Sequence, residues 1–256
     1  MKIGMFDSGI GGLTVLNEAL KLMPDEAYFY YADTDNVPYG NKTADRIRAY
    51  SEKAVGFLAD IGCDAVVIAC NTATAVAAAY LRERFDIPII GIEPAVKPAV
   101  EHNAGKRILV LATEVTAHEK KLEDLISRVD NEKLVDVKAM PGLVAFAEKG
   151  EFESEAVREY LSSEMSGIDP AEYGTIVFGC THFNHFKAAV RSVFGQDIEL
   201  IDGSAGTVRN LKKTLEGMGI PSEGKNRIKY YESGREVADK EKLAFFSDII
   251  RHLNEC

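Results

Sequence analysis

The sequence has no tryptophan, few cysteines and no long hydrophobic run. Its longest apolar runs, such as Ala65–Ala69 and Ile87–Ile92, are far shorter than the roughly 20 residues that a membrane-spanning helix needs. Lysine already stands at position 2, before the hydrophobic region of a signal peptide could form. We therefore expect a cytoplasmic protein that does not bind a membrane.

Positive charge is also scarce. The chain has 30 Lys and Arg against 40 Asp and Glu, which gives a formal net charge of −10. A nucleic-acid-binding surface requires a basic patch or stripe, and no basic stretch offsets this acidic balance. We therefore expect no nucleic-acid partner. The 256 residues, 46% of them hydrophobic, are enough for one large domain or two small ones, each with a core.

The four cysteines are widely spaced, at Cys63, Cys70, Cys180 and Cys256. No CxxC pair occurs, so neither a zinc ribbon nor a thioredoxin-type site is indicated. No other metal-ligand spacing is present, and we expect neither a metal nor another cofactor. Thiols stay reduced in the cytosol, and a free thiol can act as an acid or a base.

Short β-branched runs alternate with amphipathic stretches along most of the chain, and the clearest helix spans residues 47–61. The predicted strands are Ile3–Phe6, Ala27–Tyr31, Ala65–Ala69, Ile87–Ile92, Ile108–Ala112, Leu134–Val137, Thr175–Phe178, Ile198–Ile201 and Ile228–Tyr231. This alternation predicts an α/β fold with mostly parallel sheets. Functional sites are then expected beyond the carboxyl ends of the strands.

A weak internal repeat relates Asp64–Pro94 to Tyr173–Ser204. Each segment reads as a strand, a cysteine, a turn with Asn or Thr, a helix, a second strand and an acidic residue. The repeat predicts two pseudo-symmetric α/β lobes that face a central cleft. We place residues 1–96 and 208–256 in the first lobe and residues 97–207 in the second.

Cys70 and Cys180 occupy equivalent places in the repeat, each after an apolar strand and before a helix. A helix N-terminus lowers a thiol pKa and binds carboxylates through its N–H groups. Either cysteine alone could be a buried structural residue, but the shared context favours a functional pair. Two thiols on facing lobes suit inversion of a stereocentre, which needs a base on one face and an acid on the other.

Three further residues could tune these thiols. Asp7, at the end of the first strand, could orient or deprotonate Cys70, or it could serve only in a helix N-terminal turn. His182 could do the same for Cys180, although a lone histidine is more often structural. Glu148 is a possible third acid, with a solvated helix face as the alternative.

The glycine-rich loops do not predict a nucleotide site. Gly9–Leu13 resembles a dinucleotide-binding fingerprint, but Thr14 stands where the last glycine should be. Residues 40–43 lack the order of a phosphate-binding loop. Instead, Asp7–Gly9 could offer backbone N–H groups and a hydroxyl to a small anion.

Taken together, these segments resemble the glutamate racemases of the aspartate/glutamate racemase superfamily. The matching segments are Phe6–Leu16, Tyr30–Thr43, Val67–Ala75, Ile87–Ala99, Phe178–His182 and Ile201–Arg209. The resemblance implies that Cys70 and Cys180 are the paired acid and base, acting on D-glutamate and L-glutamate respectively. It also implies a cofactor-independent homodimer that supplies D-glutamate for peptidoglycan. The implied substrate contacts are Asp7, Ser8, Tyr39, Gly40, Asn71, Thr72, Thr181 and His182.

The chain departs from the family pattern in three places, one of which is Met140, where a cysteine is common before Pro141. Thr113 and Thr116 keep the threonines of a substrate-binding segment, but Val115 and Glu119 differ from the usual residues there. After the second Cys-Thr-His, residues 183–185 read Phe-Asn-His where the family usually has Tyr-Pro-Leu. We expect the last of these, His185, on the surface of a helix.

Two other functions remain open. The first is a racemase of the same superfamily that acts on aspartate or a hydantoin. His182 favours glutamate, because aspartate racemases of the superfamily usually carry Glu after the second Cys-Thr. The second is a non-catalytic two-lobed protein that binds an acidic amino acid, which would need the cleft but not the two thiols.

Overall fold

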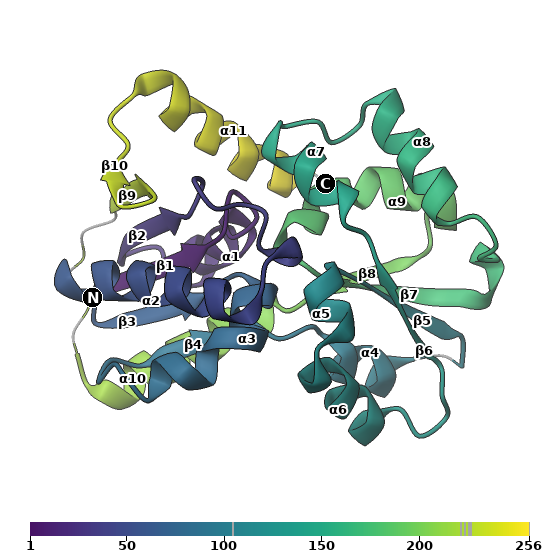
Figure 1. The fold of residues 1–256 in the computed structure, drawn as a ribbon, viewed down its shortest axis with the longest axis horizontal. Helices are drawn as coiled ribbons and strands as arrows, with labels where there is room; N and C mark the ends of the chain where they lie inside the picture. Colours follow the sequence, from purple (N-terminus) through teal and green to yellow (C-terminus); the bar gives the residue numbers. More distant parts are fainter. Residues whose placement is uncertain (104, 221, 223, 225–226, 256) are drawn as a thin grey trace.

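The computed structural model describes residues 1–103, 105–220, 222, 224 and 227–255. It contains two separate sheets, each with helices packed on it, which lie side by side in Figure 1. The α/β class, the mostly parallel sheets and the two lobes expected from the sequence are confirmed.

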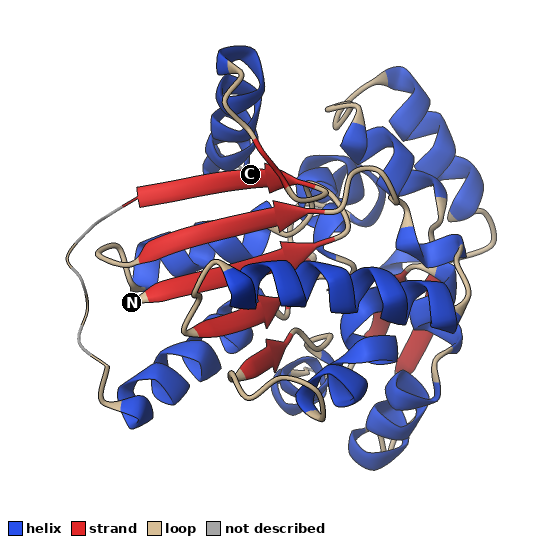
Figure 2. Cartoon of the chain, turned by 60° about the vertical axis from the view of Figure 1, so that its left-hand side comes forward, coloured by secondary structure: helices blue, strands red, loops and turns tan. Residues whose placement is uncertain are grey.

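The first sheet has six strands in the order β10-β9-β2-β1-β3-β4. They are β1 (Lys2–Asp7), β2 (Ala27–Ala32), β3 (Ala65–Ile68), β4 (Ile89–Gly91), β9 (Arg227–Glu232) and β10 (Arg235–Glu236). All neighbours pair in parallel except β9 and β10. In Figure 2 the parallel strands point toward the second lobe, so their carboxyl ends face it.

The second sheet has four strands in the order β6-β5-β7-β8, and all of them pair in parallel. They are β5 (Arg107–Ala112), β6 (Val135–Ala139), β7 (Tyr173–Gly179) and β8 (Glu199–Asp202). All nine strands predicted from the sequence are present. The two-residue strand β10 was not predicted, because it is too short to show an alternating pattern.

The helices fill the segments between strands. The α-helices are α1 (Leu13–Leu22), α2 (Ala44–Asp60), α3 (Asn71–Arg82), α4 (Val96–His102), α5 (Glu114–His118), α6 (Lys120–Val129), α7 (Gly142–Glu148), α8 (Glu155–Glu164), α9 (Lys187–Phe194), α10 (Ser204–Met218) and α11 (Lys240–Glu255). The 3₁₀ turns are η1 (Tyr39–Asn41), η2 (Pro170–Glu172) and η3 (Thr181–Phe186). Among the described residues, none of the helices has the length and apolar character needed to cross a membrane.

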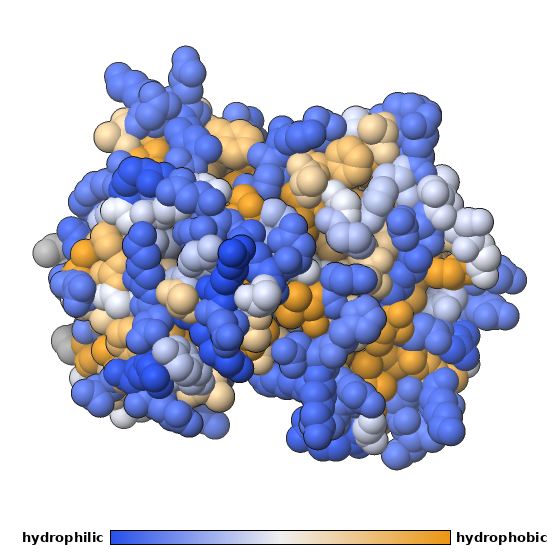
Figure 3. Space-filling view, in the orientation of Figure 1, coloured by the Kyte–Doolittle hydropathy of each residue, from blue (hydrophilic) through white to orange (hydrophobic). Residues whose placement is uncertain are grey.

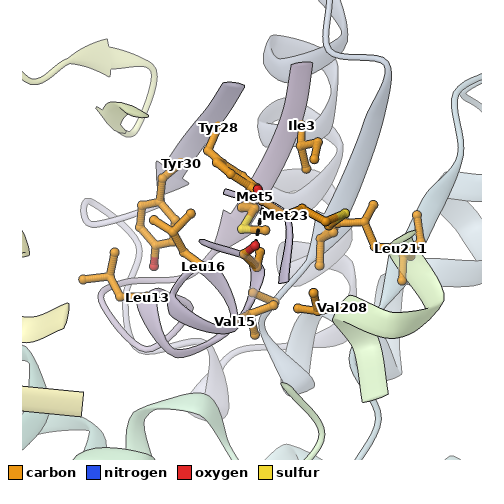
Figure 4. Close-up of a cluster of buried hydrophobic side chains, with 14 of the residues drawn as sticks. Ile3, Met5, Leu13, Val15, Leu16, Met23, Tyr28, Tyr30, Val208 and Leu211 are labelled. Carbon is orange, nitrogen blue, oxygen red and sulfur yellow. Dashed lines mark hydrogen bonds between the residues drawn. The ribbon is translucent and has the colours of Figure 1, made fainter. Parts of the chain in front are cut away.

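Helices cover the first sheet on both faces, so its central strands are almost entirely buried. On one face Ile3 and Met5 of β1 pack with Leu16 of α1 and Leu211 of α10 in a single buried cluster, drawn in Figure 4. Burial of each such side chain contributes about 1.5–3 kcal/mol. The side of the molecule that Figure 3 shows is mostly hydrophilic, as expected for a chain in which 27% of the residues are charged.

The chain crosses between the two sheets twice, after β4 and after β8. Helix α4 then packs on β5 and β7 of the second sheet, whereas α10 returns to pack on α1 of the first. The division at residues 96/97 and 207/208 remains a prediction. The second of these positions lies in the first turn of α10.

Candidate active site

Cys70 lies at the point where β3 ends and α3 begins. Its sulfur accepts a hydrogen bond from the N–H of Ala73 (3.4 Å), and its thiol donates to the Ser8 hydroxyl at 3.7 Å. The side chain is only 6% exposed. Burial and then the nearby charge of Asp7 raise the pKa of Cys70, and together they outweigh the lowering by the Ala73 amide. The expected lowering of this thiol pKa at a helix N-terminus is therefore wrong.

Cys180 occupies the equivalent place after β7 and is also 6% exposed. Its sulfur lies 3.8 Å from Nδ1 of His182. The segment that follows is the 3₁₀ turn η3, and the α-helix α9 starts only at Lys187. The sequence predicted a helix directly after both cysteines. After Cys180 a helical turn is present at the predicted place, but it is a 3₁₀ turn.

His182, which is buried, and Glu148, which is half-buried, form an ion pair beside Cys180. Nε2 of His182 lies 2.6 Å from Oε1 of Glu148, and the same oxygen accepts the N–H of Ile10 at 2.9 Å. Burial disfavours a charge on the ring, but hydrogen bonds to Cys180 and Glu148 raise the pKa of His182 well above its usual value. Glu148 thus lies in the site, with its carboxylate bound to His182, and not on a solvated helix face.

Asp7 connects the two lobes from the first-sheet side. Its Oδ1 accepts the N–H of Gly9 (2.9 Å), and its Oδ2 accepts the hydroxyl of Thr181 (3.2 Å) from the second lobe. Burial raises the pKa of Asp7, although the charge of His182 and the Gly9 amide oppose this. The N–H groups of Gly9 and Ile10 are therefore engaged by carboxylates of this chain, which limits the anion site expected in this loop.

Three buried threonine hydroxyls meet where the two lobes contact each other. Oγ1 of Thr72, in the first turn of α3, lies 2.9 Å from that of Thr113 and 3.3 Å from that of Thr116. Thr113 caps α5 and donates to Thr116 at 3.0 Å. A Cβ at Gly40 would lie 2.8 Å from Cβ of Thr113, so only glycine lets η1 come this close. The structure therefore brings these four predicted contact residues together.

Asn71 carries an unpaired polar atom in this region. Its side chain is buried at the start of α3, and Oδ1 has no hydrogen-bond partner in the part of the chain that the structure describes. A buried carbonyl oxygen without a partner is uncommon, because its desolvation is not compensated. This oxygen is free to accept a hydrogen bond from a bound molecule.

Asp33 is a buried site residue that the sequence analysis missed. It accepts hydrogen bonds from the hydroxyl of Tyr39 (2.6 Å), from Nδ2 of Asn36 (3.0 Å) and from the hydroxyl of Ser233 (2.9 Å). It therefore orients Tyr39, a predicted substrate contact. Its position directly after β2 could have identified it from the sequence. Asp7, at the end of the neighbouring strand β1, pairs with Ala32, so the two aspartates lie at almost the same level of the sheet.

His185 is buried, and the expectation of a surface position is wrong. It is 1% exposed, and its ring stacks on Phe152 with centroids 4.7 Å apart. All six residues of η3 are buried, so no face of this turn reaches solvent. The ring of His185 lies beside those of Phe152 and of His252 in α11, which come from distant parts of the chain.

The two halves of the site are close enough to interact electrostatically. The charge of Cys180 contributes to the raised pKa of Cys70. Each thiol has its own polar partners, Ser8 and Asp7 for Cys70 and His182 with Glu148 for Cys180. Such an arrangement can remove a proton from one side of a bound molecule and return one from the other.

Comparisons with known proteins agree with this geometry. Residues 13–211 match the Asp/Glu/Hydantoin racemase family. The glutamate racemase of Lachnospira eligens is 49% identical, with 99% of this chain and 98% of the relative covered. The crystal structure of glutamate racemase from Campylobacter jejuni has a TM-score of 0.80 at 30% identity and covers 97% of both chains.

A third relative was solved with ligands. The structure of Escherichia coli glutamate racemase in complex with L-glutamate and the activator UDP-MurNAc-Ala has a TM-score of 0.77 at 31% identity, and the alignment covers 84% of this chain and 82% of that one. The resemblance inferred from the sequence motifs is confirmed. This chain belongs to the Asp/Glu/Hydantoin racemase family.

Proposed function

We propose that this protein interconverts L-glutamate and D-glutamate without a cofactor and so supplies D-glutamate for peptidoglycan. The observation that carries this proposal is the pair of buried thiols, Cys70 and Cys180, one after a strand of each sheet at the cleft. The choice of glutamate is supported by the relatives, which are named glutamate racemases, and by the L-glutamate bound in the Escherichia coli structure.

The reaction requires one thiolate and one thiol at the start. The thiolate removes the α-proton, and the electron pair of the broken C–H bond stays on the α-carbon as a carbanion. The opposite thiol then donates its proton to the other face, which inverts the centre and leaves a thiolate on that side. The family resemblance assigns removal of the proton from L-glutamate to Cys180 and from D-glutamate to Cys70.

Different groups support the two thiols. His182, charged through its bond to Glu148, lies beside Cys180 and can exchange a proton with its sulfur across 3.8 Å. On the other side, burial and the carboxylate of Asp7 raise the pKa of Cys70 and hold it as a thiol, although the hydrogen bond to Ser8 opposes this. We assign Cys180 as the base and Cys70 as the acid in the resting site.

The polar groups of the cleft suit an amino-acid dicarboxylate. Oδ1 of Asn71 can accept from the α-ammonium group, since it has no partner among the described residues. The hydroxyls of Thr72, Thr113, Thr116 and Thr181 can donate to the carboxylates. Ser8, Tyr39 and Gly40 complete the proposed substrate-binding set.

Substrate entry requires a change in this site. Both thiols are buried, and the contacts Asp7–Thr181 and Ile10–Glu148 join the two lobes directly across the cleft. We infer that these two contacts open when glutamate enters and that the substrate takes over their hydrogen-bonding groups. We also propose a cytoplasmic homodimer, on the family resemblance.

The test is circular dichroism of purified protein with L-glutamate and no added cofactor, with L-aspartate and a chiral hydantoin in parallel. We expect the signal to decay to zero with glutamate only. Decay with another substrate alone identifies the alternative racemase. If none decays while glutamate still binds to the Cys70→Ser/Cys180→Ser double variant, the protein is a binding protein.

A further inference from the structure

Three aromatic rings from distant segments stack against one another beside the Cys180 half of the site. The ring of Phe152 stacks on His185 (4.7 Å between centroids, 19° between planes) and on His252 (4.5 Å, 17°). The two imidazoles lie 5.9 Å apart at 26°. Nε2 of His252 also lies 3.2 Å from the backbone carbonyl oxygen of His185. We call these three residues the ring stack.

The ring stack connects the C-terminal helix to both members of the His182–Glu148 pair. Phe152 follows Glu148, the last residue of α7, by four positions, and it packs against the cores of both lobes. His185 follows His182 by three positions in η3. His252 belongs to α11, which in Figure 1 runs from the first sheet to the side of α7.

Packing alone does not explain why residue 185 of this stack is a histidine. His185 is 1% exposed, and neither ring nitrogen has a hydrogen-bond partner in the described part of the chain. A buried polar group without a partner is destabilising, and an aliphatic residue would avoid that cost. Burial, followed by the charges of His182, His252 and Lys187, lowers the pKa of His185 well below its usual value. The ring is therefore neutral and stacks like an aromatic hydrocarbon.

Hydrogen bonds fix the start of η3, where the Thr181 hydroxyl donates to Asp7 and the Thr181 carbonyl oxygen accepts the Thr14 hydroxyl. The His185 ring, near the other end of the turn, has no hydrogen-bond partner in the described part of the chain, so ring contacts hold that end. His182 must keep Nδ1 near the Cys180 sulfur and Nε2 at Glu148. A rigid contact one turn further along would hold both.

We propose that the ring stack positions the Cys180 half-site: α11, through His252 and Phe152, holds η3 and the end of α7 so that His182 stays between Cys180 and Glu148. Phe152, His185 and His252 are positioning residues, since none of them contacts the reacting sulfur. The proposal rests on the proposed racemase function and goes beyond it, because it makes the C-terminal helix part of one half-site only.

The test separates the two half-sites with a glutamate analogue that carries chloride on the β-carbon. When a thiolate removes the α-proton, the electron pair forms a C=C bond and expels chloride, and the enamine hydrolyses to 2-oxoglutarate and ammonium. This elimination needs one base only. The enantiomer processed by Cys180 is the one that the Cys70→Ser variant still converts, which we expect to be L.

Phe152→Ala removes the shared ring of the stack. We expect elimination from the L analogue to slow by roughly 10- to 100-fold, the loss that a displacement of about 1 Å causes at a catalytic group. Elimination from the D analogue should stay within about twofold. Phe152→Tyr keeps the ring and should restore the L rate. Phe194→Ala is the matched control, because Phe194 is also half-buried in the second lobe but contacts Tyr173 at the far end of β7.

If Phe152→Ala does not fold, His252→Ala removes the other end of the stack from a half-buried position and is measured in the same way. Equal slowing of both enantiomers, or no slowing of either, overturns the positioning role. If the wild-type protein itself converts neither enantiomer and does not racemise glutamate, the proposed function fails instead, so the two failures are distinguishable.

Discussion

Replacing Asp7 by Asn should lower turnover strongly and leave the fold intact. The amide keeps an oxygen for the N–H of Gly9, and the Thr181 hydroxyl can rotate to accept from the new NH₂ group. The change therefore removes a negative charge next to Cys70 while both hydrogen bonds can re-form.

Asp7→Asn should have two opposite effects: it lowers kcat, and it does not lower the stability of the fold. Positioned acid–base groups contribute about 10²- to 10⁴-fold to a rate, so we expect kcat to fall by that factor, or roughly 2.7–5.4 kcal/mol in barrier. Asn at position 7 still offers a carbonyl oxygen to the substrate, so KM should stay within about threefold. Burial raises the pKa of Asp7. Its ionised form therefore costs stability as pH rises through the folded pKa, and the neutral amide removes that cost. The melting temperature at neutral pH should thus be equal or higher.

The assay is circular dichroism of both directions together with thermal unfolding. Glu26→Gln is the matched control, because Glu26 is a buried carboxylate at the opposite, amino end of β2, paired with the N-terminus. It should lower stability and leave kcat unchanged. A rise in KM for Asp7→Asn with unchanged kcat would refute the reasoning and make Asp7 a substrate-positioning residue.

Three other predictions concern metals, packing and acid stability. Racemisation should persist after exhaustive dialysis against chelator and without pyridoxal phosphate; loss that a metal restores would contradict this. Gly40→Ala should raise KM about tenfold or more, since the added methyl group collides with Thr113; an unchanged KM in steady-state kinetics would show that η1 can move aside. In the unfolded state His185 binds a proton below about pH 6.5, whereas the buried ring of the folded state stays neutral. The free energy of unfolding should therefore fall as the pH is lowered from about 7 to about 5. The urea concentration at the unfolding midpoint should fall less steeply with decreasing pH in His185→Leu than in the wild type. The same pH dependence in both proteins would mean that another group is responsible.

The sequence predicted the strands and the two cysteine positions because both depend on local pattern. In a parallel α/β fold the central strands are continuous apolar runs, and the residue after each strand lies at the cleft. Cys70, Cys180 and Asp7 all follow or end such strands. His182 comes two residues after Cys180, so its place beside that sulfur also follows from the local chain.

What the sequence could not predict depends on three-dimensional contact. The raised pKa of Cys70 results from burial and from the nearby charge of Asp7, and no local pattern reports either. The burial of His185 depends on the rings of Phe152 and His252, which lie far from it in the sequence. Glu148 bonds to the N–H of Ile10, 138 residues away in the sequence, so its role is visible only once the lobes meet.

The central claim is that two thiols act on opposite faces of one substrate, and the single cysteine variants test it most directly. A serine hydroxyl is a far weaker acid and base than a thiol near neutral pH, so Cys70→Ser and Cys180→Ser should each lose racemisation. With the β-chloro analogue, Cys70→Ser should convert the L enantiomer alone, and Cys180→Ser the D enantiomer alone. Conversion of both enantiomers at equal rates by one variant would contradict the two-base account.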